Sequence, residues 1–238
     1  MKKIIAGNWK MNGSAASLRT MLDAIAPVQT ENTIIICPSF TMLNTTVPAN
    51  VKLGAQDISE YESGSYTGDV SAKMVADMGA KFVIVGHSDR RKNHGETNET
   101  VAAKAATALA HGLTPLICVG ETREQKESGQ TMTVIEELVR KSIPTKPSAP
   151  IIIAYEPLWA ISTTGIGLTP THDDIRAVHG HIAKILGDMG LDGTVILFGG
   201  SVNGNTAAEI MAIEHVDGVL VGAKSLEPND FIPIIKAV

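Results

Sequence analysis

The sequence predicts an α/β fold in which residues 1–238 form a single (β/α)8 barrel domain with a parallel eight-stranded core. Three observations support this prediction. Eight short apolar runs recur along the chain, and each is followed by a turn and a stretch with helical periodicity. No shift in composition divides the chain, and 238 residues suit one such barrel better than two smaller domains.

The predicted strands are mostly continuous hydrophobic stretches, as expected for a parallel sheet that is covered on both faces. In chain order they span Lys3–Ala6, Thr33–Cys37, Val51–Ala55, Phe82–Val85, Thr114–Val119, Ile151–Tyr155, Val195–Phe198 and Gly218–Val221. The competing architecture is a doubly wound open sheet. That fold usually carries a glycine-rich phosphate loop after an early strand, and the sequence contains none of GxGxxG, GxxxxGKS and GxxxxGKT.

Side chains that can cap a helix precede four of the predicted helices, since a Ser, Thr or Asn oxygen accepts hydrogen bonds from free N–H groups in the first turn. The expected caps are Ser14 before Ala15, Asn98 before residues 100–110, Thr171 before the helix with Ile175 and Ile182, and Asn205 before Thr206–Ala212. His111–Gly112 is the expected terminator of the second of these helices.

Composition and charge argue against several classes of function. The net charge of -5 disfavours a nucleic-acid partner, and the longest basic run, Arg90–Lys92, is predicted to be a solvated loop or helix start. No apolar run approaches the roughly 18 residues of a membrane span, and the N-terminal run is too short for a signal sequence, so the expected location is the cytoplasm. Cys37 and Cys118 each end an apolar run and are expected in core strands, not in a disulfide.

The residues that follow the predicted strands carry the chemistry, because catalytic groups of such barrels lie at the carboxyl ends of the strands. Asn8 and Lys10 follow the first strand, His87 and Asp89 follow the fourth, and Glu156 follows the sixth. Glycine-rich turns follow the seventh and eighth strands. Each residue alone is more often an ordinary polar residue at the rim, but their meeting on one rim points to a site.

This set of groups can move a proton between adjacent carbons of a carbonyl compound. A carboxylate removes the proton, while an imidazole and an ammonium stabilise the charge that develops on the oxygen. Backbone N–H groups of the glycine-rich turns can bind a phosphate dianion. The sequence has no HExxH and no paired CxxC motif, so we expect a sugar-phosphate isomerase without a metal or organic cofactor.

Seven motifs resemble those of the triosephosphate isomerase family, in order and spacing along essentially the whole chain. They are AGNWKMN (Ala6–Asn12), TGDVS (Thr67–Ser71), VIVGHSDRR (Val83–Arg91), GETNETV (Gly95–Val101), CVGET (Cys118–Thr122), AYEPLWAI (Ala154–Ile161) and GGSV (Gly199–Val202). The resemblance implies an aldose–ketose isomerase of glycolysis and gluconeogenesis that interconverts dihydroxyacetone phosphate and D-glyceraldehyde 3-phosphate through an enediolate. It also implies a cofactor-independent homodimer.

The resemblance assigns roles to individual residues. Glu156 matches the base that shuttles the proton, and His87 matches the neutral electrophile that polarises the carbonyl. Lys10 matches the electrostatic stabiliser, with Asn8 beside it in the oxyanion-binding group. The remaining matches are Ser201, Gly200, Gly222 and Ala223 for the substrate phosphate, Pro157, Leu158, Trp159, Ala160, Ile161, Ser162, Thr163, Thr164 and Gly165 for the lid, and Thr67 and Gly68 in the loop Gly64–Gly68 that enters the neighbouring subunit.

Four departures from the family pattern lie near the expected site. They are Asp89 in place of Glu, an altered and longer lid through Gly167, Phe198 in place of the Tyr that latches the lid, and Ala223–Lys224 in place of Gly–Ala. They leave open a paralogous isomerase of a longer ketose phosphate, such as a phosphorylated tetrulose, and a non-catalytic sugar-phosphate-binding barrel. Lys10 and Lys224 are the candidates for steering a phosphate dianion into the site.

Overall fold

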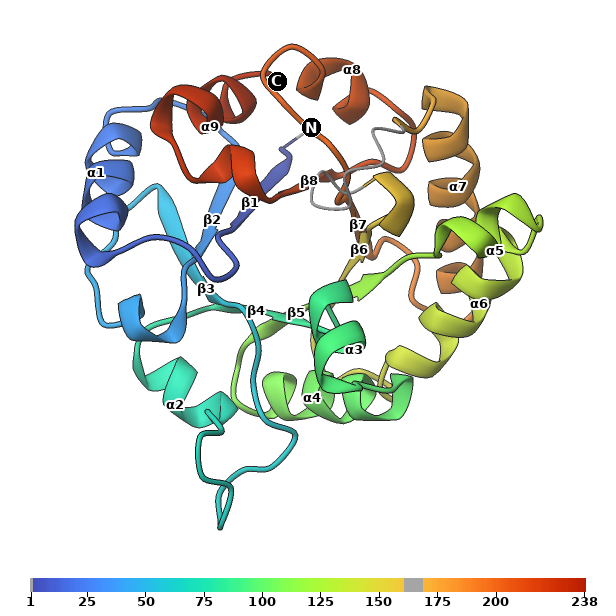
Figure 1. Cartoon of the computed structure of the whole chain (residues 1–238), viewed down its shortest axis with the longest axis horizontal. Coiled ribbons are helices and arrows are strands. Elements are labelled where there is room, and N and C mark those ends of the chain that lie inside the picture. The colour runs from blue at the N-terminus through green and yellow to red at the C-terminus, as the bar shows by residue number, and fades with distance from the viewer. Residues whose placement is uncertain (1, 161–168) are drawn as a thin grey trace.

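The computed structural model describes residues 2–160 and 169–238, and these form a closed barrel of eight parallel strands. Figure 1 looks along the barrel, with the strands in a central ring and the helices around it. The strands are β1 (Ile4–Asn8), β2 (Thr33–Cys37), β3 (Val51–Ala55), β4 (Phe82–Val85), β5 (Thr114–Val119), β6 (Ile152–Tyr155), β7 (Val195–Phe198) and β8 (Gly218–Val221). Each strand pairs with its neighbours in sequence, and β8 closes the ring on β1. The predicted fold class is confirmed.

The strand boundaries differ from the prediction mainly at β1. This strand begins one residue later than predicted and continues to Asn8, because its pairing with β2 extends to the register Asn8↔Cys37. β6 begins at Ile152, one residue later than predicted. The extension of β1 matters for the site, since it fixes the backbone of Asn8 within the sheet.

Helices that connect the strands surround the barrel in the described part of the chain (Figure 1). They are α1 (Ala15–Ile25), α2 (Ala72–Asp77), α3 (Ser88–His94), α4 (Asn98–Ala110), α5 (Arg123–Glu127), α6 (Thr131–Ser142), α7 (His172–Asp188), α8 (Ala207–Met211) and α9 (Pro228–Ile235), with short 3-10 turns η1 (Phe40–Met42), η2 (Leu158–Ala160) and η4 (Ala223–Ser225). Longer helices such as α1 and α7 bury one apolar stripe against the strands.

Two of the four expected helix caps are confirmed. The side-chain oxygen of Ser14 accepts a hydrogen bond from the N–H of Ser17, and that of Thr171 accepts one from the N–H of Asp174. In both cases the side chain at the third helical position accepts a bond from the cap's own N–H group, which completes a capping box.

The other two expected caps are wrong by one residue. The cap of α4 is Thr97, whose hydroxyl accepts from the N–H of Thr100, whereas Asn98 is the first helical residue. Asn98 instead accepts hydrogen bonds from Arg91 at 2.7 Å and from the hydroxyl of Ser142 at 3.2 Å, and the contact with Ser142 joins distant parts of the sequence. α8 follows Thr206, and the N–H of Asn205 donates to the side chain of Asn203.

The core has two layers. Inward-facing strand residues such as Ile35, Leu116 and Leu197 fill the barrel, and the opposite strand faces pack against the helices. Cys37 and Cys118 lie in the inner layer as free, buried thiols, which confirms the expectation for both. Burial raises the pKa of the Cys37 thiol to about 12.

No helix in the described ranges is both long and apolar enough to cross a membrane.

Candidate active site

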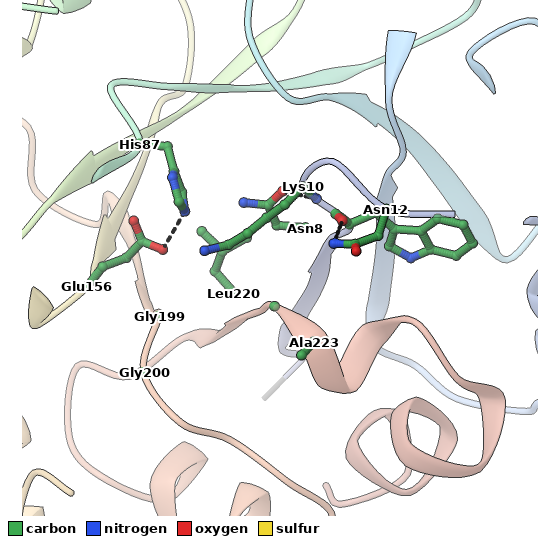
Figure 2. A pocket seen from close by; sticks show the side chains of 11 residues that line it. Asn8, Lys10, Asn12, His87, Glu156, Gly199, Gly200, Leu220 and Ala223 are labelled. Carbon is green, nitrogen blue, oxygen red and sulfur yellow. Dashed lines mark hydrogen bonds and ion pairs between the residues drawn. The ribbon is translucent and has the colours of Figure 1, made fainter. Parts of the chain in front are cut away.

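A cavity opens at the carboxyl ends of the strands, where residues from distant parts of the chain meet (Figure 2). It is lined by Asn8, Trp9, Lys10, Asn12, His87, Glu156, Gly199, Gly200, Leu220, Gly222 and Ala223. The strands β1, β4, β6, β7 and β8 and the turns after them supply all of these residues. The cavity therefore collects the carboxylate, the imidazole, the ammonium and the glycine-rich turns that the sequence predicted for one rim.

Glu156 and His87 face each other across the cavity (Figure 2). The Nε2 atom of His87 lies 3.2 Å from Oε1 of Glu156, and the two residues are 4% and 5% exposed. The N–H of Glu156 donates to the carbonyl of Val119 at 2.8 Å, so the backbone of the residue after β6 is tied to β5. In this position the Glu156 carboxylate can accept a proton from a substrate, while the imidazole N–H of His87 donates a hydrogen bond to the substrate.

The position of His87 at the start of α3 defines its tautomer. Its Nδ1 atom accepts a hydrogen bond from the backbone N–H of Asp89 at 3.0 Å, in the manner of a helix cap. A nitrogen that accepts from a peptide N–H carries no proton, so the neutral ring holds its proton on Nε2. The donor of His87 is consequently directed into the cavity.

Opposing effects set the pKa of His87. Burial disfavours the charged ring and lowers its pKa, but the charge and hydrogen bond of Glu156, with a smaller contribution from Asp89, raise it above the ordinary value. Lys10 acts in the same direction as burial. Burial and the hydrogen bond that Nδ1 accepts from the Asp89 N–H both favour the neutral ring against the effect of Glu156.

Lys10 has a strained backbone and points its ammonium into the cavity (Figure 2). Its φ of 51° lies in the left-handed region, which costs a non-glycine residue about 1 to 3 kcal/mol. The side chain of Asn8 accepts a hydrogen bond from the Lys10 N–H at 3.0 Å and so stabilises this conformation. Nζ of Lys10 lies 3.2 Å from Oδ2 of Asp89, so the shorter Asp side chain still reaches the cation.

Only part of the expected phosphate set lines the cavity. Gly200, Gly222 and Ala223 are lining residues, whereas Ser201 is exposed at the surface and is not one of them in the described structure. A Cβ atom on Gly200 would collide with the ring of Phe198, so the absence of a side chain there lets the turn pack over that ring. Lys224 pairs with Asp230 at 3.1 Å, which offsets the charge that we expected to steer an anion.

Residues that sequence reasoning left out also line the cavity. Asn12 lies beside Lys10 and donates a hydrogen bond to the carbonyl of Trp9 at 2.9 Å, which ties the loop after β1 together. Leu220 faces inward from β8, and Gly199 faces Glu156. Asn12 lies inside the AGNWKMN motif and Gly199 begins the GGSV motif, so both had a signal in the sequence, whereas the inward orientation of Leu220 depends on packing between strands.

The expected lid is described only at its first residues. Leu158, Trp159 and Ala160 form η2, and the indole N–H of Trp159 donates to Oε1 of Glu121 at 2.8 Å. The expected lid residues Ile161, Ser162, Thr163, Thr164 and Gly165 lie outside the described residues, as does the altered stretch through Gly167.

Thr67 and Gly68 lie in the long loop between β3 and α2, which projects away from the barrel (Figure 1). The rings of Tyr61 and Tyr66 stack in this loop with centroids 4.0 Å apart. Both tyrosines are more than two-fifths exposed.

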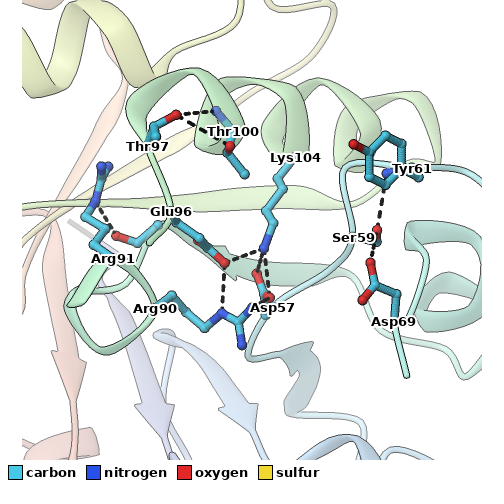
Figure 3. A network of polar contacts seen from close by, with 11 residues as sticks. Asp57, Ser59, Tyr61, Asp69, Arg90, Arg91, Glu96, Thr97, Thr100 and Lys104 are labelled. Carbon is cyan, nitrogen blue, oxygen red and sulfur yellow. Dashed lines mark hydrogen bonds and ion pairs between the residues drawn. The ribbon is translucent and has the colours of Figure 1, made fainter. Parts of the chain in front are cut away.

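A largely buried network of charges joins α3, the helix that begins after His87, to α4 and to the loop after β3 (Figure 3). The ammonium of Lys104 lies 2.7 Å from Asp57 and 2.5 Å from Glu96, and Arg90 bridges the same two carboxylates. The basic run at Arg90–Lys92 lies in the middle and last turn of α3, not at the predicted helix start, and Arg90 pairs with two carboxylates instead of being fully solvated. Arg91 also turns inward and donates to the carbonyl of Gly86 at 2.8 Å.

The described residues contain no group of three or more His, Cys, Asp or Glu side chains that could hold a metal ion. The cavity presents several protein groups that can act on a substrate. Those groups are a carboxylate, an imidazole N–H, an ammonium and backbone N–H groups of glycine-rich turns.

Comparisons with known proteins show the family to which the chain is similar. A family model described as Triosephosphate isomerase matches residues 3–238. A similar protein from Gluconacetobacter diazotrophicus, named Triosephosphate isomerase, is 43% identical, and the match covers 100% of this chain and 98% of the relative. Another protein of the same name, from Bradyrhizobium diazoefficiens, is 42% identical, and the match covers 99% of this chain and 97% of the relative. A crystal structure of triosephosphate isomerase from Bartonella henselae superposes with a TM-score of 0.87, at 36% identity, and covers 100% of this chain and 99% of that one.

Proposed function

Because this chain belongs to the triosephosphate isomerase family, we propose that the cavity at the carboxyl ends of its strands is the isomerase active site. The protein is an aldose–ketose isomerase that interconverts dihydroxyacetone phosphate and D-glyceraldehyde 3-phosphate by proton transfer through an enediolate. The observation that carries the site assignment is the contact of 3.2 Å between His87 and Glu156 beside the ammonium of Lys10.

Glu156 acts as the base. Its carboxylate removes a proton from the carbon next to the carbonyl, and the protonated carboxyl returns that proton to the neighbouring carbon. The almost complete burial of this residue favours such a transfer, since a desolvated carboxylate in an enclosed site holds no competing shell of water.

His87 and Lys10 stabilise the oxygen charge of the enediolate. The Nε2–H of neutral His87 donates a hydrogen bond to the substrate oxygen, and a base paired with a neutral imidazole is an arrangement for which this family is itself a standard example. The ammonium of Lys10 supplies positive charge where the oxygen becomes negative. Asn8 contributes by holding the strained backbone of Lys10.

Gly200, Gly222 and Ala223 bind the phosphate through backbone N–H groups, and Ser201 adds its own N–H from the surface side of the same turn. The residues from Pro157 to Gly165 close over the substrate as a lid and exclude water, a role for which this family is again a standard example. Asp89 holds the ammonium of Lys10 and the ring of His87 in place through its side chain and its N–H group.

The protein is a homodimer in the cytoplasm, and residues 1–238 form one domain. Exposed large hydrophobic side chains support the dimer: Met11 is 96% exposed, and Phe40, Tyr61, Tyr66, Met74 and Met78 are also exposed. Met11 and Phe40 line a groove beside Lys10, and Phe40, Tyr61 and Thr67 line the adjoining one. The projecting loop with Thr67 and Gly68 enters the partner. A fully active monomer in sedimentation at assay concentration contradicts this assembly.

The decisive experiment measures turnover of the two triose phosphates in metal-free buffer, beside a phosphorylated tetrulose. We expect fast triose interconversion that is lost in Glu156→Gln. The relatives argue against the tetrulose alternative, since the family model and both similar proteins carry the triose name. A protein that binds phosphoglycolate no better than substrate, and turns over neither sugar, would instead be a non-catalytic binding barrel.

A further inference from the structure

Arg91 of α3 donates hydrogen bonds from one guanidinium to groups on four other segments of the chain. Its Nε atom donates to the carbonyl of Gly86 at 2.8 Å, and a terminal nitrogen donates to the carbonyl of Cys118 at 3.3 Å. The other bonds go to Oδ1 of Asn98 at 2.7 Å and to Oγ of Ser142 at 3.0 Å. All four of these acceptors are uncharged, and they use the N–H donors of a planar fork, which an ammonium does not provide.

Two of these bonds lead to the backbones of the catalytic pair. Gly86 immediately precedes His87, so the carbonyl that Arg91 holds belongs to the peptide group between these two residues. Cys118 lies in β5, and the carbonyl of the next residue in that strand accepts the N–H of Glu156 at 2.8 Å. One rigid guanidinium therefore links the backbone before the imidazole to the strand that holds the backbone of the base.

The peptide group after Gly86 depends on such a contact for its direction. Gly86 has a φ of 66°, in the left-handed region that glycine adopts readily, and glycine has no side chain that restricts rotation of its backbone. A Cβ atom there would lie 2.6 Å from Cγ2 of Val101 and 3.0 Å from a terminal nitrogen of Arg91, so the backbone passes directly against the guanidinium. Both Gly86 and His87 are buried, and the bond from Arg91 favours one direction of the carbonyl between them.

From these contacts we propose that Arg91 is a positioning residue for the isomerase reaction, which fixes the imidazole of His87 relative to the carboxylate of Glu156. The inference rests on the proposed roles of those two residues. Their side chains lie 3.2 Å apart, and a displacement of about 1 Å at a reacting group can cost 10²-fold in rate. The residues that line the catalytic cavity do not include Arg91, so it acts on the reaction through the backbone.

Arg91→Lys tests this inference, because lysine keeps the charge but loses the planar fork that reaches several acceptors at once. We expect kcat for either triose phosphate to fall about tenfold, while KM stays within about twofold of the wild-type value. Phosphoglycolate, which resembles the enediolate, binds about tenfold more weakly, whereas inorganic phosphate binds as in the wild type. Arg91→Met removes every donor and should lower kcat further, by about 10²-fold.

Nitrogen-15 NMR of the His87 ring provides a readout that a purely structural role would not move. Nε2 of this ring faces Glu156, so its resonance responds to the relative placement of the two side chains. We expect this resonance to move in folded Arg91→Lys. Since the variant retains the positive charge, the loss of a cation cannot cause the change.

Ser142→Ala is the control for stability, because it removes a buried acceptor of the same guanidinium but leaves the bonds to Gly86 and Cys118. We expect it to lower the midpoint of urea denaturation, while kcat and the His87 resonance keep their wild-type values. Lys92→Met is the control for the charge that Arg91→Met removes, since Lys92 is the exposed cation that follows in α3. We expect Lys92→Met to retain full activity.

The outcomes separate this inference from the proposed function. If the wild type isomerises triose phosphates and Glu156→Gln does not, but Arg91→Lys matches the wild type, the role of Arg91 is wrong and the active site stands. A lower kcat with an unmoved His87 resonance also overturns that role, since Arg91 would then not act through His87. An equal loss of kcat in Ser142→Ala or in Lys92→Met would assign the effect to stability or to charge, against the inference. If Glu156→Gln retains activity, the assignment of the base is wrong.

Discussion

His87 and Glu156 share a contact of 3.2 Å between Nε2 and Oε1 while both side chains are almost completely buried. The same carboxylate is the main cause that raises the pKa of the ring, against the opposing effect of burial. The protonation of the imidazole and the position of the base are consequently coupled, so a change at Glu156 should appear as a change in the pKa of His87.

The first prediction concerns this coupling. In Glu156→Gln, burial and Lys10 remain to lower the pKa of His87, the carboxylate that contributes most to raising it is gone, and only the smaller effect of Asp89 opposes them. We therefore expect the His87 pKa to fall below its wild-type value, and triose turnover to fall by about 10²- to 10⁴-fold. Nitrogen-15 NMR of the labelled ring measures the pKa and reports the tautomer. A ring that titrates as in wild type, or a neutral ring protonated on Nδ1, contradicts the geometry of the site.

The second prediction concerns the largely buried charges that join α3, α4 and the loop after β3 (Figure 3). Lys104→Met leaves the carboxylates of Asp57 and Glu96 facing each other with Arg90 as their remaining cation. Breaking such a network costs about 3 to 5 kcal/mol, so chemical denaturation at neutral pH should show a loss of this size.

The control for this variant is Lys73→Met, whose exposed partner Asp77 is four residues away on α2. Its expected cost is within about 0.5 kcal/mol. The loss in Lys104→Met should shrink in acid, because the freed carboxyl groups can then take up protons. A loss that stays constant from neutral pH to pH values near 4 would mean that packing of the Lys104 stem, and not its charge, supports the fold.

The third prediction concerns His179, a fully buried residue of α7 that stacks edge-on against Tyr155. Burial lowers its pKa from 6.5 to about 4, so the folded protein holds the ring neutral and the unfolded chain binds more protons between these values. The contribution to stability is therefore complete above about pH 6.5 and is lost as the pH falls toward 4, by up to about 3 kcal/mol.

His179→Gln tests this assignment, since an amide N–H can replace the ring N–H that bonds the carbonyl of His215 at 2.9 Å. We expect the variant to be less stable at pH 7 and to lose less unfolding free energy than the wild type on acidification. Urea denaturation at a series of pH values gives both curves. Parallel curves would assign the acid sensitivity to the carboxylates instead.

Sequence reasoning was most accurate where one local pattern decides the structure. Continuous apolar runs identified the strands to within two residues at either end, because a strand covered on both faces needs no alternation of polar side chains. It was least accurate where a distant contact decides. The side chain of Asn98 accepts hydrogen bonds from Arg91 and from the distant Ser142 and does not cap α4. Arg90 joins a largely buried network, although its neighbours in sequence suggest a solvated run.

The candidate site shows the same difference between what local sequence predicts and what distant contacts decide. The order of strands in a barrel suffices to bring Lys10, His87 and Glu156 to one rim. Whether Asp89 still reaches Lys10, and whether Lys224 is free to attract an anion, depends on side-chain distances that the sequence does not contain. The structure gives 3.2 Å for the first pair, and it pairs Lys224 with Asp230.

The last prediction concerns Gly199, whose lack of a side chain leaves the space that the side chain of Glu156 occupies. A Cβ atom added to Gly199 would lie 2.5 Å from Cγ of Glu156 and 3.3 Å from its Oε1, and the backbone carbonyl of Tyr155 closes the same space. The carboxylate must therefore shift in Gly199→Ala, and a displacement of about 1 Å at a reacting group can cost 10²-fold in rate. We expect kcat to fall by about that factor while inorganic phosphate still binds.

Gly180→Ala is the matched control, since nothing lies within 4 Å of a Cβ atom at this position in the middle of α7. Alanine is the better helix former by about 1 kcal/mol, so this variant should be more stable than the wild type and fully active. Both variants add one methyl group to a glycine, so a loss of activity confined to Gly199→Ala can be assigned to the displaced carboxylate. Equal activity in the two variants would mean that Glu156 has room to move aside, and that its position is not fixed by this turn.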